Sequence, residues 1–120
     1  MRKLVGVTAL IGLMALTSCS GLTGPSEEQL RINKIEKEAT IKRWFDCMYD
    51  QSTMININTE VRTVAEIVLH RCEDIRQQVL HYQSEFMSDR ARYYFYQESK
   101  DPNQHLPMAM DIVIKAREAF

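Results

Sequence analysis

Three cysteines and three histidines are the side chains best suited to chemistry, because thiolates and imidazoles bind metal ions and act as nucleophiles or bases. His70 and Cys72 are the closest pair. Two residues apart on a helix, however, they point about 200° away from each other and cannot share an ion. His81 and His105 have no partner at a suitable spacing. We therefore expect no metal site.

Catalytic motifs give no stronger signal. The chain carries no nucleophile elbow, no Gly-rich phosphate loop and no paired-carboxylate signature. The adjacent acids Glu73 and Asp74 are interpreted as a solvated helix face. The sequence therefore predicts a protein that is not an enzyme and that needs no cofactor.

The first cysteine follows a segment with a pattern of its own. Arg2 and Lys3 precede residues 4–16, which contain no charged side chain. A helix of that length spans roughly 20 Å, which is short of the roughly 30 Å hydrocarbon layer of a bilayer, so a membrane-spanning helix is not expected. A short basic stretch followed by an apolar one is typical of a secretion signal.

The end of this segment, Leu16-Thr17-Ser18-Cys19, resembles the lipobox of bacterial lipoprotein precursors. The resemblance covers residues 1–19. It implies that residues 1–18 are removed and that Cys19 becomes an N-terminus carrying a diacylglycerol and commonly a third acyl chain, such as palmitate. Two acyl chains are enough for stable anchoring to membrane lipid. Ser20, in place of an aspartate, implies the outer membrane, with the protein facing the periplasm.

Charge and composition indicate which classes of partner the mature chain is expected to bind and how it is organised. Loss of residues 1–18 removes two basic residues and no acidic one, which changes the formal charge from −1 to −3. Affinity for nucleic acid depends largely on accumulated Lys and Arg, so we expect no nucleic acid as a partner. Residues 19–25 are small and Gly-rich, as in a flexible lipidated tether, and residues 26–120 suffice for a single domain.

Apolar periodicity predicts an all-α fold, an antiparallel helical hairpin with a short third helix. Ser26 and Gln29 form a capping-box pattern, which predicts a first helix from residue 26 to about residue 54. A second helix is expected over residues 59–97, because its apolar residues follow one stripe at spacings of three and four. The stripe consists of Val61, Val64, Val68, Cys72, Ile75, Val79, Tyr82 and Phe86.

The last part of the chain predicts a loop and a third helix. Residues 101–107 hold two prolines, which cannot continue a helix, and are therefore expected to form the loop. Apolar residues recur from Met108 to Phe120 at helical spacing. We expect this third helix to fold back onto the far end of the second.

Cys47 and Cys72 remain as an even pair for the fold. Outside the cytoplasm such a pair most simply forms a disulfide, here between the two antiparallel helices. A closed loop of about 25 residues contributes roughly 3 kcal/mol in the chain-entropy model. Cys72 is more residues away from a turn at residues 55–58 than Cys47 is. The connecting loop must therefore be shaped so that the two cysteines lie side by side.

One aromatic run suggests a binding surface. Four consecutive aromatic residues cover the circumference of a helix, so they cannot all face one core. Tyr93 is expected to continue the stripe, with Phe95 nearly opposite. Arg and Tyr are enriched at binding hot spots. The candidate interaction surface consists of Arg90, Arg92, Tyr94, Phe95 and Tyr96. Alternatively, the third helix and the proline loop cover the outward rings.

Two functional hypotheses follow, neither of them from a motif in residues 26–120. The first is a non-enzymatic interaction or assembly module of the cell envelope, anchored by lipid and binding an unidentified envelope protein. The second is an extracytoplasmic inhibitor or immunity-type protein that neutralises a toxin or lytic enzyme. This second hypothesis rests on analogy of size and compartment alone.

Overall fold

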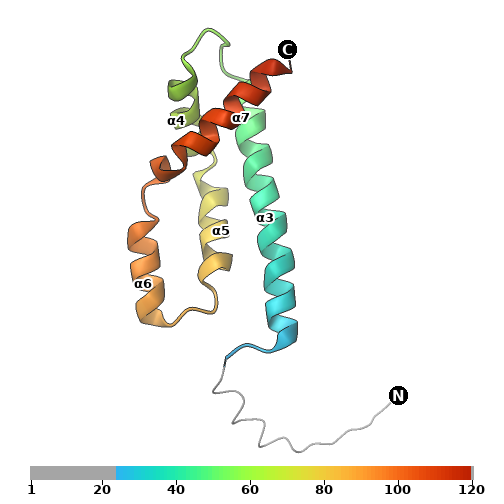
Figure 1. Cartoon of the computed structure of the whole chain (residues 1–120), viewed down its shortest axis with the longest axis vertical. Coiled ribbons are helices and arrows are strands. Elements are labelled where there is room, and N and C mark those ends of the chain that lie inside the picture. The colour runs from blue at the N-terminus through green and yellow to red at the C-terminus, as the bar shows by residue number, and fades with distance from the viewer. Residues whose placement is uncertain (1–23, 120) are drawn as a thin grey trace, which may run out of the picture. The chain divides into compact units, whose positions relative to one another are not determined.

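The computed structural model describes residues 24–119. The predicted signal over residues 1–18 and the predicted lipid attachment site, Cys19, lie outside the described residues. The described residues divide into two units between Ile32 and Asn33, and the packing considered below belongs to the second. The elements are α3 (Glu27–Thr53), α4 (Val61–Arg71), α5 (Glu73–Ser84), α6 (Asp89–Glu98), the 3-10 helix η1 (Pro102–His105) and α7 (Leu106–Glu118) (Figure 1).

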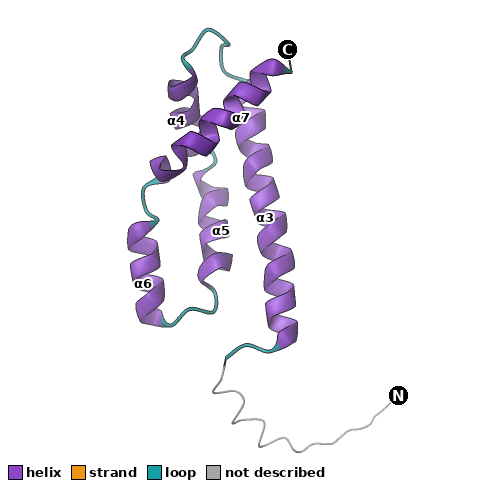
Figure 2. Cartoon of the chain, in the orientation of Figure 1, coloured by secondary structure: helices purple, strands orange, loops and turns teal. Residues whose placement is uncertain are grey.

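The all-α prediction is confirmed, since residues 24–119 form helices and no strand (Figure 2). The first helix also begins as predicted. The Ser26 hydroxyl accepts a hydrogen bond from the Gln29 backbone N–H at 3.1 Å, and the Gln29 amide oxygen accepts one from the Ser26 N–H at 2.9 Å. This reciprocal pair satisfies backbone donors that have no helical partner. The helix ends at Thr53, one residue before the predicted end.

The part of α3 from residue 33 onward runs antiparallel to α4 and α5, as the hairpin prediction requires. The direction follows from the residue numbers: as the α3 residue falls in number, the residue that it contacts toward α4 and α5 rises in number. Four side-chain contacts follow this order. They are Gln51 with Arg71, Cys47 with Cys72, Arg43 with Gln78, and Asn33 with Tyr82. The predicted disulfide is therefore present, with its Cα atoms 6.1 Å apart.

The prediction of one continuous helix over residues 59–97 is wrong, because the chain breaks at two places. At Cys72 the backbone departs from helical geometry, with φ −101° and ψ 17°, although its N–H still bonds the Val68 carbonyl at 3.0 Å. At residues 85–88 the helix stops altogether. The Ser88 hydroxyl then caps α6 by accepting from the Ala91 N–H at 3.2 Å. Ser88 is thus a helix-start signal in the sequence, and in the structure it prevails over the apolar stripe that predicted one continuous helix.

The predicted loop at residues 101–107 and the predicted docking of the third helix are both corrected. Most of the loop is helical: η1 occupies Pro102–His105, and α7 begins at Leu106 with Pro107 in its first turn. Proline is tolerated there because the first N–H groups of a helix have no partner to lose. The helix α7 packs across α4, at the near end of the predicted second helix and not at its far end (Figure 1).

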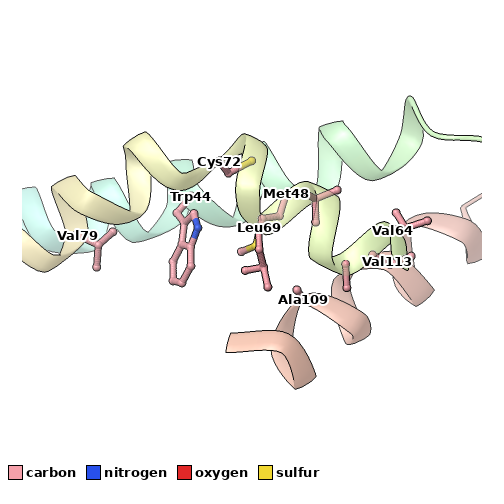
Figure 3. Close-up of a cluster of buried hydrophobic side chains, with 10 residues drawn as sticks. Trp44, Met48, Val64, Leu69, Cys72, Val79, Ala109 and Val113 are labelled. Carbon is pink, nitrogen blue, oxygen red and sulfur yellow. The ribbon is translucent and has the colours of Figure 1, made fainter. Parts of the chain in front are cut away.

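The core lies where α3, α4 and α7 meet (Figure 3). From α7, Ala109 and Val113 face inward, one turn apart. Small residues at these positions let α7 approach α4 closely. The other members are Trp44 and Met48 of α3, Val64, Ala65, Val68 and Leu69 of α4, Cys72, and Val79 of α5. Each fully buried aliphatic side chain contributes about 1.5–3 kcal/mol, so this cluster is the main source of stability.

Candidate functional site

The helix α6 carries the predicted interaction surface, and unlike the α-helices before and after it, α5 and α7, it has no buried residue. Arg90 is exposed, and the rings of Tyr93 and Tyr94 are 60% and 55% exposed. These two rings pack edge to face, with centroids 5.5 Å apart. The third helix and the proline loop therefore do not cover them.

The inward face of α6 carries Phe95 and Tyr96, which are half-buried. The Tyr96 hydroxyl is hydrogen-bonded to the Ser84 hydroxyl at 3.3 Å, so Tyr96 joins α6 to the end of α5. The expectation that Tyr93 continues the stripe while Phe95 points away is wrong. The break at residues 85–88 resets the helical phase, so the period of α4 and α5 does not extend into α6.

Arg92 has a structural role that its place in the predicted surface did not suggest. Its guanidinium donates to the backbone carbonyls of Ser84, Glu85 and Met87 at 3.3, 3.2 and 3.0 Å. It also pairs with Asp89 at 3.1 Å. The last carbonyls of a helix have no intrahelical partner, and Arg92 donates to the carbonyl of Ser84, which ends α5, and to two carbonyls of the turn that follows. We therefore assign Arg92 to the α5–α6 turn. Of the predicted surface, only Arg90 and Tyr94 face outward, and Tyr93, which the prediction did not include, joins them to form the outward α6 surface.

An ion pair between a buried arginine and a partly exposed glutamate, which residue periodicity did not predict, fixes the other end of α6. Arg76 is 0% exposed. Its Nε and Nη2 donate to the two carboxylate oxygens of Glu73 at 2.7 and 2.8 Å, and its Nη1 donates to the Ser99 carbonyl at 2.7 Å. The interpretation of Glu73 as part of a solvated face is therefore wrong, whereas Asp74 is exposed. The signal available in the sequence was the spacing of three residues between Glu73 and Arg76.

Burial and the Arg76 charge shift the pKa values of the groups around this pair. Burial raises the pKa of Glu73, but the hydrogen bonds from Arg76 and Gln77 and the Arg76 charge outweigh it, so the pKa is lowered overall. The pKa of His105 is lowered, first by burial and then by the Arg76 charge, with Glu73 opposing. The His105 ring stands edge-on to Trp44, with centroids 5.0 Å apart. Arg76 is engaged on all three nitrogens within the fold, by Glu73 and the Ser99 carbonyl, so this pair joins α5 to the end of α6.

A groove of about 340 Å³ opens at the other end of α4. The last turn of α3, the loop that follows it and the end of α7 form its walls. Its lining consists of Ser52, Thr53, Ile55, Ile57 and Arg117. The Arg117 guanidinium donates to the Thr59 carbonyl and so joins α7 to this loop. The groove depends on the packing of α7 on α4, which residue periodicity does not predict.

Cys19 lies outside the described residues, so its acylation stays a prediction. Among residues 24–119, no helix is both long and apolar enough to cross a membrane, and no three His, Cys, Asp or Glu side chains are grouped to hold a metal ion. No protein family model, curated protein or solved structure matches this chain. The assignment of function therefore rests on the residues themselves.

Proposed function

We propose that this protein is a bacterial envelope lipoprotein that acts as a non-enzymatic protein-interaction module. In this proposal the chain is anchored through acylated Cys19 to the outer membrane and faces the periplasm. The Cys47–Cys72 disulfide supports an extracytoplasmic location, because such bonds persist in oxidising compartments. The lipobox-like sequence at residues 16–19 supports the mode of anchoring.

The observation that carries the interaction role is the outward α6 surface of Arg90, Tyr93 and Tyr94. Tyrosine and arginine dominate binding hot spots, because a large ring or a guanidinium supplies contact area together with a polar group. The α6 helix is fixed at its start by Arg92 and near its end by the Arg76 bond to Ser99. A surface held in one conformation loses little entropy on binding.

The interaction role is tested by site-specific photocrosslinking in intact cells. A photoreactive phenylalanine analogue replaces Tyr94, and in the matched control it replaces Tyr49, a 38% exposed tyrosine on α3. We expect one envelope protein to be captured from position 94 and not from position 49, and Arg90→Ala to reduce the yield. Capture at equal yield from both positions, or from neither, would remove the support for this surface. A captured lytic enzyme that loses activity in the complex would identify the protein as an inhibitor instead.

The anchoring is tested separately with Cys19→Ala. We expect this variant to take up no radioactive palmitate and to remain uncleaved by the lipoprotein signal peptidase. A Cys47→Ala/Cys72→Ala variant is the control and should still be labelled, because its lipobox-like segment is intact. Label that persists in Cys19→Ala would contradict the lipoprotein assignment.

A further inference from the structure

We propose that the groove beside α7 binds the C-terminal carboxylate of a partner polypeptide whose last residue is apolar. This adds a second contact to the interaction module and rests on that proposed function. The groove lies at the end of α4 away from the Arg76 cluster, and none of its five lining residues belongs to the outward α6 surface.

The positive charge of the groove has no counterpart in the described part of the fold. Arg117 takes part in no ion pair among residues 24–119. Its bond to the Thr59 carbonyl holds the guanidinium in the wall and uses one of its five N–H donors. A guanidinium fixed in this way matches a carboxylate, with which it forms charge-assisted hydrogen bonds.

The other walls select the rest of the ligand. Ile55 and Ile57 make part of the groove apolar, and Ile57 is 55% exposed although it is a large aliphatic residue. Such exposure at the mouth of a hollow leaves apolar area for a ligand side chain to cover, at about 25 cal/mol per Å². An aliphatic or aromatic last residue therefore fits this wall.

The polar wall at the end of α3 distinguishes a peptide from a fatty acid. The Ser52 and Thr53 hydroxyls, both on residues that line the groove, donate to the Met48 and Asp50 carbonyls, each at 2.7 Å, so each hydroxyl oxygen has only acceptor capacity left for a ligand. The last carbonyls of a helix also lack partners. A peptide terminus brings backbone N–H donors for these acceptors in addition to a carboxylate and a side chain, whereas a fatty acid has no N–H.

The test measures binding of fluorescein-labelled hexapeptides to the full mature chain in nanodiscs, with empty nanodiscs as the blank. One peptide ends in leucine with a free carboxylate, and the second is identical but ends in an amide. We expect saturable binding of the first and binding about tenfold weaker or worse for the second, since a charge-assisted bond is lost.

Two matched variants locate the site. Ile57→Asp places a negative charge at the groove, and Ile35→Asp makes the same change at a 52% exposed isoleucine on α3 outside the groove. Both positions are exposed, so neither change disturbs the core. We expect Ile57→Asp to weaken binding of the carboxylate peptide about tenfold, by repulsion and lost apolar contact, and Ile35→Asp to leave it unchanged.

Several results would overturn this inference. They are the absence of saturable binding, equal affinity for the amide peptide, equal loss in the two variants, and displacement of the peptide by octanoate at comparable affinity. Self-association of the chain that Ile57→Asp abolishes would assign the groove to a second copy. Crosslinking from position 94 does not involve the groove, so its success or failure is read independently of these peptides.

Discussion

Removal of the Glu73 charge should destabilise the protein far more than removal of any exposed carboxylate. Breaking a buried ion pair by removing one partner typically costs about 3–5 kcal/mol, because the remaining charge is buried without compensation. Here Arg76 is 0% exposed, but the Glu73 side chain is 27% exposed and glutamine keeps one acceptor oxygen. We therefore expect Glu73→Gln to lower the free energy of unfolding by about 2–3 kcal/mol.

The assay is urea unfolding at pH 7.5 with the disulfide intact, compared with Glu66→Gln as the matched control. Glu66 pairs with Arg62 at 3.6 Å, and both side chains are exposed, so the control should lose less than about 0.5 kcal/mol. The difference between wild type and Glu73→Gln should also shrink below pH 4.5, as the wild-type carboxyl becomes protonated. Equal losses in the two variants, or a difference that stays constant down to pH 3, would refute the reasoning.

Three further predictions concern the Cys47–Cys72 disulfide, His105 and the Ser88 cap of α6. A Cys47→Ser/Cys72→Ser variant should lose about 3 kcal/mol in urea unfolding, and two titratable thiols in the denatured wild-type protein would contradict the disulfide. Folding lowers the pKa of His105 below its ordinary value of 6.5. The contribution of neutral His105 to stability is therefore fully present above pH 6.5 and is lost as the pH falls through the lowered pKa of the folded protein. His105→Gln should remove that part of the pH profile, and an unchanged profile would show that His105 is not responsible. Ser88→Ala should cost about 1 kcal/mol through loss of the cap, and faster amide hydrogen exchange over residues 89–92 than in wild type should accompany it.

The sequence was sufficient to predict what depends on local chemistry and on one apolar stripe. The capping box at Ser26 could be predicted from a four-residue motif. The pairing of Cys47 with Cys72 could be predicted because they are the two cysteines left once Cys19 is assigned to lipid attachment. The stripe from Val61 to Val79 does face the core. Beyond Val79 it fails, because Phe86 is 41% exposed and lies in the break between α5 and α6.

What the sequence did not predict depends on long-range packing of polar groups. Arg76 lies in a helix that also carries Glu73, Asp74 and His81, and no periodicity rule places an arginine inside. Its burial requires the Ser99 carbonyl to arrive from a segment 23 residues away. The groove likewise needs Arg117 and Ile57 to meet through the docking of α7, and residue spacing alone does not provide that contact.

Polar ties rather than apolar burial explain how α6 is held in place. The helix has no buried residue, yet Arg92 fixes its start, the Tyr96–Ser84 bond its middle, and the Arg76–Ser99 bond the residue that ends it. Each tie is a directional hydrogen bond, so together they set the rotation of α6 about its axis and thereby the outward direction of its exposed tyrosines. Arg92→Ala should therefore reduce crosslinking from α6 while the core, which contains no α6 residue, keeps its stability.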